Sequence, residues 1–385
     1  MRIIACAAAA VALAGCAGTS EMGGGRYAVS ANDNKLVLDN GVAKVPPNPA
    51  PDTVAIIDLR ASPPAVVAEI EAPTSVVGPP TSVAITPDES IALVTSAMKI
   101  LASDPTKQVP DNRMSVIDLT VRPPRVIATL EAGAGAAGVS INRAGTLALV
   151  ANRSEGTVSV FTIAGKTVAP AGKIPVGEAN SGPSHVVIAA DGKTALLTRD
   201  NDHKISVLAI DGTKVTYTKR DLNAGLRPYG MDICPPGNIA VVANIGIGQG
   251  DHDTISVIDL TLQPPRVTET LTVGQTPEGI KCSPDGSWVG VVVMNGSNKP
   301  ANSPFYAANG KLVIYQVNGK QLQKFGEAPI GSWSQGVVFS GGYVLVQNMV
   351  QKNIQVFRLD RGGLSDTGQR IQLKAGPAGI RTAEK

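Results

Sequence analysis

The stretch TISVIDLTLQPPRVTETLTVGQTPEGIKCSPDGSWVGVVV, residues 254–293, contains the pattern that decides the fold. Two β-branched runs meet at Pro264-Pro265, a third follows Pro277-Glu278-Gly279, and a fourth follows the turn Pro284-Asp285-Gly286. Proline cannot donate a hydrogen bond to a strand ladder, so it belongs between strands. The stretch therefore predicts four short strands joined by tight turns.

The strand entry at Pro277-Glu278-Gly279-Ile280 recurs along the chain. The entries begin 43 to 57 residues apart, at Pro80, Ala136, Pro183, Pro228, Pro277, Ser334 and Pro377. Four short strands in a unit of roughly 45–50 residues are the signature of a propeller blade. The sequence thus predicts an all-β protein, a seven-bladed β-propeller with four antiparallel strands per blade.

Three of the units also share a longer match around a turn. Each contains an Ile-Asp-Leu run, a Pro-Pro pair that begins four residues after the leucine, and a valine two residues after the second proline. The runs begin at Ile57, Ile117 and Ile258. Each match joins two β-branched runs, which is typical of neighbouring antiparallel strands.

The two ends of the repeat array predict how the ring closes. The first unit begins at Arg26 with its second strand, residues 27–32, and lacks a first strand. The chain finishes with an extra first strand, residues 377–382. The C-terminal strand is therefore expected to join the first blade, which removes the open edges that invite aggregation.

The second strands carry a recognisable ending. Leu149-Val150-Ala151-Asn152 and Val241-Val242-Ala243-Asn244 resemble the YVTN-type propeller repeats, and the resemblance extends over residues 26–382. It implies a propeller fold. It says little about activity, because that superfamily includes surface-layer proteins, lactonase-like enzymes and proteins of no known activity.

The composition excludes some partners. Lys and Arg number 34 against 31 Asp and Glu, and aromatic residues make up 3% of the 385 residues. Phosphate binding requires clustered positive charge and base stacking requires aromatic surfaces, so nucleic acid is not expected as a partner. No Cys-x-x-Cys-His run occurs and no glycine-rich phosphate loop leads into a helix, so no cofactor is expected.

The N-terminus resembles a targeting signal rather than part of the fold. An apolar stretch over residues 3–13 is too short to span a bilayer and suits a secretory signal. It ends in Leu13-Ala14-Gly15-Cys16, which resembles a bacterial lipobox; an ordinary signal peptide is the alternative. The expected organisation is a lipoprotein signal peptide at 1–15, a lipidated Cys16 with a flexible tether at 16–25, and the propeller at 26–385.

This reading predicts a location for the protein. In such signals, a residue other than aspartate after the cysteine usually directs the protein to the outer membrane, and Ala17 stands there. An outer-membrane lipoprotein of a bacterial cell envelope, facing the periplasm, is therefore expected, with the membrane contacted only through the lipid anchor.

One face of the ring is the better candidate for function. Antiparallel pairing places the strand entries beside the loops between second and third strands. The longer loops, at 32–52, 96–112, 245–253 and 295–309, lie on this face, and loops carry function more often than strands. The candidate ligand-binding residues expected there are His185, Asn152, Arg199, Asn244, Asn295, Gln335 and Asn348.

His185 differs from the residues at the same position of the other entries, which are Gly or Ser in six of seven blades. The run Gly182-Pro183-Ser184-His185 looks like the strand entry of lactonase-family propellers, in which a histidine faces the channel mouth. That resemblance implies His185 as general base and an arginine, Arg227 or Arg153, as the group that stabilises the oxyanion. Glu278 is the best carboxylate candidate.

The remaining histidines and cysteines leave alternatives open. His203 and His252 share the loop face with carboxylates, but their spacing matches no metal motif, so no metal site is predicted. Cys234 and Cys282 fall on the first strands of adjacent blades with opposite parity, which facing side chains require. They form either a disulfide or two buried thiols.

Two functions follow from these residues. The first is an envelope-anchored binding module that takes a protein or small-molecule ligand on its loop-rich face and channel mouth. The alternative is a lactonase-like enzyme that hydrolyses or forms a lactone there. A quinone- or haem-dependent oxidoreductase on a propeller scaffold is a weaker third idea.

Overall fold

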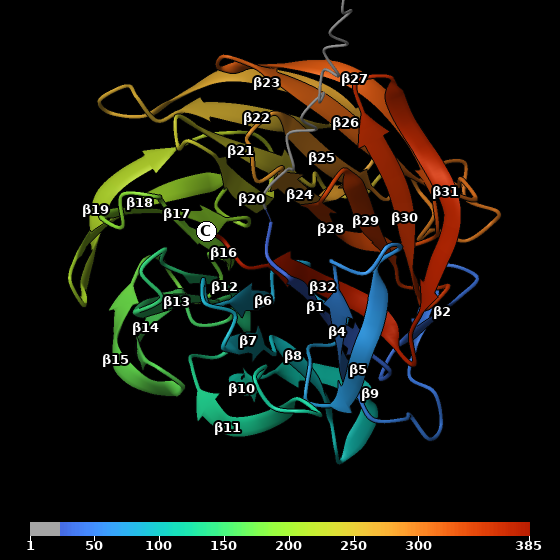
Figure 1. The fold of residues 1–385 in the computed structure, drawn as a ribbon, viewed down its shortest axis with the longest axis horizontal. Coiled ribbons are helices and arrows are strands. Elements are labelled where there is room, and N and C mark those ends of the chain that lie inside the picture. Colours follow the sequence, from blue (N-terminus) through green and yellow to red (C-terminus); the bar gives the residue numbers. More distant parts are fainter. Residues whose placement is uncertain (1–23) are drawn as a thin grey trace, which may run out of the picture.

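The computed structural model describes residues 24–385, and within them every regular element is a β-strand. Seven four-stranded antiparallel sheets stand around a central channel (Figure 1). The prediction of a seven-bladed propeller with four strands per blade is therefore confirmed. The predicted signal peptide and the lipidation of Cys16 lie outside the described residues.

The innermost strands of blades 1 to 7 surround the channel. They are β32 (Gly376–Thr382), β6 (Val83–Ile85), β12 (Ala136–Ile141), β16 (Pro183–Ile188), β20 (Pro228–Cys234), β24 (Pro277–Cys282) and β28 (Ser334–Ser340). The second strands, in the same order, are β1 (Tyr27–Asp33), β7 (Ile91–Thr95), β13 (Leu147–Asn152), β17 (Thr194–Arg199), β21 (Ile239–Asn244), β25 (Trp288–Val293) and β29 (Tyr343–Asn348).

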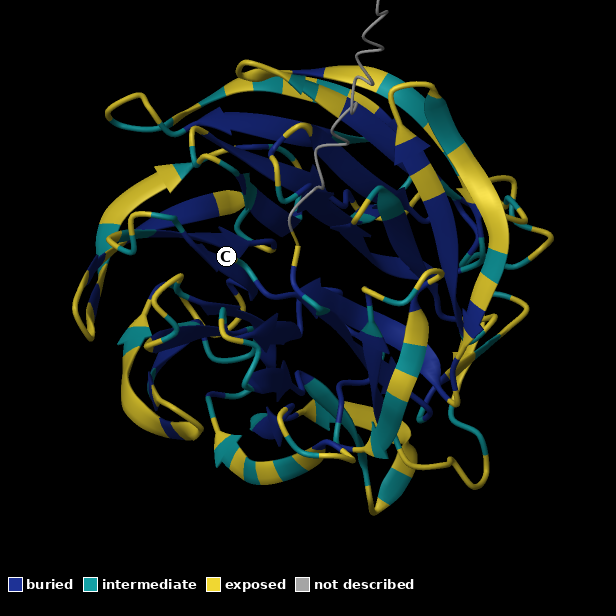
Figure 2. Ribbon diagram, viewed as in Figure 1, coloured by how far each residue is buried: buried dark blue, intermediate teal, exposed yellow. Residues whose placement is uncertain are grey.

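The outer half of each blade is more exposed. The third strands are β4 (Thr53–Asp58), β10 (Arg113–Asp118), β14 (Thr157–Ala164), β18 (Lys204–Asp211), β22 (Asp253–Asp259), β26 (Gly310–Asn318) and β30 (Asn353–Asp360). The outermost strands are β5 (Ala65–Glu71), β11 (Arg125–Glu131), β15 (Thr167–Pro175), β19 (Lys214–Leu222), β23 (Arg266–Gly274), β27 (Gln321–Ile330) and β31 (Gly363–Gln372). Figure 2 shows buried inner strands and outer strands on which exposed positions recur.

The ring closes in blade 1, where the last strand pairs with the first. β32 is antiparallel to β1, and the register joins Ala28 to Thr382 and Asn32 to Pro377. The predicted closure by the C-terminal strand is therefore confirmed. Seven apolar clusters of buried side chains hold neighbouring blades together, since each draws residues from two adjacent sheets.

Two long loops of the predicted functional face contain hairpins. Strands β2 (Val37–Asp39) and β3 (Val42–Lys44) lie between β1 and β4, and β8 (Met98–Leu101) and β9 (Asp104–Pro110) lie between β7 and β10. An eighth apolar cluster, of Leu36, Val76, Met294, Trp333 and Met349, packs these loops against their neighbours. This face, with the strand entries and the second-to-third-strand loops, is called the loop face below; the opposite one is called the turn face.

Candidate functional site: the channel mouth

The inner strands approach one another closely at their entries. A Cβ on Gly230 would lie 2.2 Å from the carbonyl oxygen of Glu278, and a Cβ on Gly279 would lie 2.2 Å from that of Gln335. Only glycine fits at these third positions of the entries. The second positions border the channel mouth; they hold Thr81, Ala137, Ser184, Tyr229, Glu278, Gln335 and Ala378.

Two arginines converge on one buried aspartate beside the mouth. Asp200, in the β17–β18 loop, has a fully buried side chain and accepts hydrogen bonds from Arg153 Nη2 and Arg227 Nη2, each at 2.7 Å. Ser184 Oγ donates to the second oxygen of Asp200 at 3.1 Å and also contacts Arg153. Blades 3 and 5 thus contribute one arginine each, and blade 4 contributes Asp200 and Ser184, to one cluster of ion pairs and hydrogen bonds.

Each arginine has a second constraint. The Arg153 guanidinium lies 5.6 Å from the centre of the Tyr229 ring, a cation–π distance. Arg227 has φ of 55°, and its backbone N–H donates to His203 Nδ1 at 3.2 Å. Its Nε is buried and has no hydrogen-bond partner. One donor of Arg227 is therefore unsatisfied in this arrangement.

Glu278 combines a half-buried position with unusual electrostatics. Burial raises the pKa of its carboxyl to about 7, and Gln335, Arg153 and Arg227 oppose that rise. Burial also raises the pKa of Tyr229. A carboxyl that ionises near neutral pH suits general acid–base chemistry.

Gln335 lies next to this carboxyl and has unused hydrogen-bonding capacity. Its side chain is fully buried, yet neither its Nε2 nor its Oε1 has a hydrogen-bond partner. It is near enough to Glu278 to lower the pKa of that carboxyl. Thr81 Oγ1, at the equivalent position of blade 2, is likewise buried without a partner. Buried polar groups without partners are rare, and here they border the channel mouth.

His185 lies below this level, in the channel wall. Its side chain is buried, and Nδ1 accepts the backbone N–H of Met231 at 3.2 Å. Burial, reinforced by Arg381 and Lys281, lowers the pKa of the imidazole well below its usual value. Because the lowered pKa makes the imidazole a weak base and Nδ1 already accepts a hydrogen bond, His185 is a weaker candidate base than Glu278.

A charged network closes the channel beneath His185. Lys281 Nζ bonds Asp232 Oδ1 at 3.0 Å and Glu384 Oε1 at 2.7 Å, so the C-terminal residues are tied across the channel. Arg381 is buried beside them, and its Nη2 has no partner. His185, Asp232, Arg381 and Glu384 line a cavity of about 20 Å³, room for about one water molecule. A ligand therefore reaches the mouth only from the loop face.

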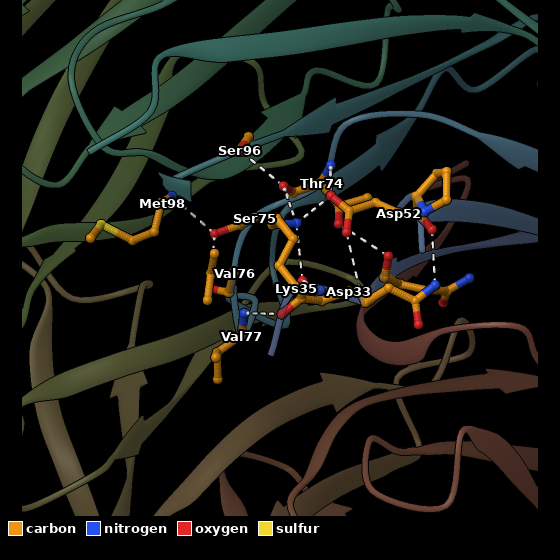
Figure 3. Close-up of polar contacts among 12 residues, drawn as sticks. Asp33, Lys35, Asp52, Thr74, Ser75, Val76, Val77, Ser96 and Met98 are labelled. Atoms are coloured by element: carbon orange, nitrogen blue, oxygen red, sulfur yellow. Dashed lines mark hydrogen bonds and ion pairs between the residues drawn. The ribbon is translucent and has the colours of Figure 1, made fainter. Parts of the chain in front are cut away.

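The loop that follows β1 is fastened by a buried ion network (Figure 3). Lys35 Nζ contacts Asp33 Oδ1 at 3.0 Å, also contacts Asp52, and donates to the carbonyl of Thr74 at 3.1 Å. Asp33 Oδ2 accepts the N–H of Val77 at 2.9 Å. Burial raises the pKa of Asp33 even though Lys35 opposes the rise. The network fixes one side of the rim of the mouth.

The loop that follows β1 also meets the loops of other blades. The β2–β3 turn passes blade 7 to reach blade 6, where Ala301 N donates to Asn40 Oδ1 at 3.1 Å. The blade 6 loop in turn meets blade 5, since Lys299 Nζ donates to the carbonyl of Gly248 at 2.6 Å. The loops of blades 1, 6 and 5 thus contact one another along the loop face.

Three of the predicted ligand-binding asparagines lie inside their blades. Asn152 receives the N–H of Gly133 and donates to Thr157 and Ser159. Asn348 and Asn244 make the equivalent donations to the third strand, and Asn348 also accepts the N–H of Gly331. These residues fasten the loop that joins the fourth strand of one blade to the first strand of the next. Their role is therefore structural.

The other predicted residues either make structural contacts within the blades and loops or border the channel mouth. Arg199 replaces this asparagine in blade 4 and bonds Ser206, Tyr217 and Asp202 within its own blade. Asn295 donates to the carbonyl of Asn309 at the base of a loop, and His252 is exposed. The structure brings together Arg153, Arg227, Glu278 and Gln335.

Three members of the mouth were missed by sequence reasoning: Asp200, Ser184 and Tyr229. Asp200 lies in the run Arg199-Asp200-Asn201-Asp202, whose residue types also favour solvated turns. Tyr229 and Ser184 occupy the same entry position as Glu278, so the repeat register could have identified them.

Cys234 and Cys282 form a disulfide between blades 5 and 6, with Cα atoms 5.2 Å apart. Within residues 24–385, no group of three His, Cys, Asp or Glu side chains is arranged to hold a metal ion. No helix there is long and apolar enough to cross a membrane.

Comparison with known proteins identifies the fold. No family model and no curated protein sequence matches the chain. Among solved structures, a candidate 6-phosphogluconolactonase of Bacteroides uniformis is 19% identical, with a TM-score of 0.70, over 93% of this chain and 99% of that one. The periplasmic gluconolactonase of Pseudomonas aeruginosa is 17% identical, with a TM-score of 0.64 and the same coverage.

A third similar structure has no known activity. It is a protein of unknown function from Desulfotomaculum acetoxidans, 15% identical, with a TM-score of 0.68, over 93% of this chain and 99% of that one. Identities this low establish a shared propeller fold, which many activities use.

Proposed function

We propose that this protein hydrolyses a small lactone at the channel mouth, with Glu278 as general base. The observation that carries the proposal is the half-buried Glu278, whose pKa is raised to about 7 beside two arginines held by Asp200. The lactonases among the structural neighbours support this substrate class. The two arginines favour a lactone that carries an anionic group, because guanidinium groups bind carboxylates and phosphates.

The residues divide the reaction between them. The Glu278 carboxylate takes a proton from a water molecule as the water oxygen attacks the lactone carbonyl carbon. Arg227, whose Nε has no partner, or Arg153 stabilises the resulting oxyanion. The ring C–O bond then breaks, and the proton held by Glu278 passes to the departing ring oxygen, which leaves a hydroxy acid.

Hydrolysis of sugar lactones by Glu278→Gln tests the proposal. Removing a general base should lower kcat by about 10²- to 10⁴-fold. Glu131→Gln, on the exposed outer strand β11, is the matched control and should retain full activity. The rate should rise with pH through about 7, after subtraction of spontaneous hydrolysis, because Glu278 must be ionised. Full activity in Glu278→Gln would exclude the mechanism.

A specific observation also favours the binding module as a second function. Most large exposed apolar side chains in residues 24–385 lie on the loop face: Val37, Val42, Leu226, Ile247, Phe305, Tyr306 and Val350. Exposed apolar groups with aromatic residues among them are typical of protein interfaces. Phe305→Ser with Tyr306→Ser should then abolish capture of an envelope protein and leave lactone hydrolysis unchanged.

We further propose that the protein is anchored in the bacterial outer membrane through Cys16 and faces the periplasm. The chain enters the described structure on the turn face, where Gly24 lies beside Phe339 and Ser340. An anchor there would turn the loop face away from the bilayer. Incorporation of labelled palmitate should be lost in Cys16→Ser, and an unlabelled wild-type protein would refute anchoring.

A further inference from the structure

The residue that begins each second strand fills the gap to the next blade. In each blade, one residue at the end of the second strand pairs with the strand entry. The residue five positions before it in the sequence is large and apolar or aromatic in six of the seven blades. In blades 1 to 7 the residues are Tyr27, Ile91, Leu147, Thr194, Ile239, Trp288 and Tyr343. Blade 4, with Thr194, is the exception.

The six large residues belong to the clusters that join adjacent blades. Tyr27 packs with Ile85 and Leu119 of blade 2, and Trp288 packs with Phe339 of blade 7. Ile91, Leu147, Ile239 and Tyr343 occupy the corresponding places in their own clusters. The residue therefore works as a wedge between blades on the turn face.

Where blade 4 meets blade 5, the wedge is missing and a cavity of about 490 Å³ remains. Its apolar lining includes Leu196, Ile233 and Pro264. Its polar lining includes Asp191, Thr194, Arg220 and Gln263. The volume falls in the range of small-molecule sites, about 300 to 1,000 Å³. The cavity lies on the turn face, away from the channel mouth.

The ring makes the same kind of junction twice more. Blades 1, 2 and 5 carry the Pro-Pro turn, so the wedge opposite that turn comes from blades 7, 1 and 4. In the first two junctions the wedge is tyrosine, Tyr343 and Tyr27. Opposite Pro264-Pro265 it is Thr194. The protein thus fills two of the three sites with its own phenol ring.

The filled junction of blades 1 and 2 also shows how the phenol is held. The hydroxyl of Tyr27 meets Arg122, which directly precedes the Pro-Pro pair and whose guanidinium lies 5.6 Å from the ring centre. Gln263 stands at the place of Arg122 in blade 5 and lines the cavity. An amide can donate to a phenol oxygen and accept from a phenol hydroxyl.

The lining of the cavity holds two charged side chains, Arg220 and Asp191. Arg220, on β19, lines it with an exposed side chain for which the structure gives no ion pair or hydrogen bond. Guanidinium groups bind carboxylates with two parallel hydrogen bonds. Asp191 is directed to local turns, since its Oδ1 accepts the N–H groups of Lys193 and Thr194.

We propose that this cavity, here named the wedge site, binds a small molecule that carries a phenol ring and a carboxylate. The ring takes the place of the missing tyrosine between Leu196, Ile233 and Pro264. Gln263 binds the hydroxyl, and Arg220 binds the carboxylate. The proposal does not depend on the chemistry of the channel mouth.

Titration with 4-hydroxyphenylacetate, followed by calorimetry or by ligand-observed NMR, tests the wedge site. Thr194→Tyr supplies the missing wedge and should weaken binding at least about tenfold, a difference of about 1.4 kcal/mol. Thr216→Tyr, the same change at an exposed position of β19, should bind like the wild type. Arg220→Gln should weaken 4-hydroxyphenylacetate but leave the uncharged 4-hydroxybenzyl alcohol unaffected.

A further probe and the variants distinguish support for the wedge site from its rejection. Cyclohexylacetate should bind more weakly than the phenolic probe, because Gln263 then has no hydroxyl to meet. No saturable binding to the wild type overturns the proposal, as does equal binding by wild type and Thr194→Tyr. If Thr194→Tyr does not fold, Thr194→Ile repeats the residue of blades 2 and 5 and must weaken binding in its place.

Discussion

At the scale of single residues, Glu278 stands out because its environment opposes its charge. The entry position is a backbone crossing point at which neighbouring inner strands nearly touch. A side chain there is drawn out of water, and a carboxylate loses hydration that the nearby arginines only partly replace. The cost of holding the ionised form is a measurable property of the folded protein.

This cost gives stability a definite pH dependence. Between the usual pKa of 4.5 and about 7, the folded state binds a proton that the unfolded state has lost. The contribution of Glu278 to the free energy of unfolding therefore falls as pH rises through this window. Glu278→Gln should be more stable than the wild type by about 1 to 2 kcal/mol at pH 8 and equal at pH 4, once solvent screening is allowed for.

Urea unfolding at the two pH values measures this difference. Glu131→Gln, exposed on β11, should show no such pH-dependent gain. A Glu278→Gln protein that is no more stable at pH 8 would mean that the carboxylate is well solvated. It would also remove the basis for its role as a base near neutral pH.

Asp200 should behave in the opposite sense, because it compensates buried positive charge. Asp200→Asn removes the carboxylate that pairs directly with both Arg153 and Arg227. Breaking a buried pair in this way costs about 3 to 5 kcal/mol, and the partial exposure of both arginines places the expected loss nearer 2 kcal/mol.

The control for Asp200 is Asp211→Asn, an exposed position at the end of β18. Its free energy of unfolding should differ from the wild type by less than about 0.5 kcal/mol. Adding Arg153→Gln and Arg227→Gln to Asp200→Asn should restore part of the loss, since the unpaired charges are then gone. If the triple variant is no better than Asp200→Asn, the repulsion between the arginines is not the cause.

Sequence alone reached some residues of the mouth and not others. Glu278 and Gln335 follow from the entry repeat, since any polar residue at the second position borders the channel. The asparagines that end the second strands lie on the predicted face, but their side chains turn into the blade. There their amides form hydrogen bonds with backbone and hydroxyl groups. Side-chain direction at a strand end depends on the loop that follows, which the repeat pattern does not specify.

At the scale of elements, the third entry position sets how closely two inner strands approach. Gly230→Ala should cost more than about 2 kcal/mol, because a Cβ 2.2 Å from the Glu278 carbonyl oxygen forces neighbouring backbones apart. Gly326→Ala is the matched control: it lies in β27, and its nearest neighbour would be 3.9 Å away. Thermal unfolding of both variants makes the comparison; equal melting temperatures would show that the blades yield easily.

The strands were the most predictable elements, for physical reasons. Proline and glycine mark strand ends because they cannot continue a ladder or can adopt the turn geometry. The β2–β3 and β8–β9 hairpins were expected only as long loops. Their strands are exposed or half-buried throughout, so they lack the alternation that reveals a strand. In blade 2 the inner strand begins only at Val83, three residues after its entry.

At the scale of the whole molecule, stability depends on closing the ring. Removing residues 376–385 leaves the inner edge of β1 without its partner β32 and uncovers part of the core of blades 7 and 1. The truncated chain should be monomeric only at low concentration and should self-associate through that edge. Light scattering measures this; removing Lys385 alone should have no effect.

A synthetic peptide of residues 376–385 provides the converse experiment. Added in excess, it should bind the truncated chain and restore the monomer, since it replaces a strand with its full register. A peptide with Arg381 and Glu384 replaced by alanine should bind less well, because both side chains contribute to the charged network in the channel. A truncated chain that stays monomeric without peptide would show that closure is not required.

The first and last described residues lie close together on the turn face, and this proximity bears on where the chain can begin and end. Gly25 lies against Ala383, so a short linker could join them without moving a strand. The chain could then be opened at the tip of the β8–β9 hairpin, where the backbone is exposed. Such a circular permutant would carry its seam in blade 2 while every hydrogen bond between β1 and β32 remained. Seven similar blades in a closed circle have no intrinsic first member, so the fold itself does not determine where the termini lie.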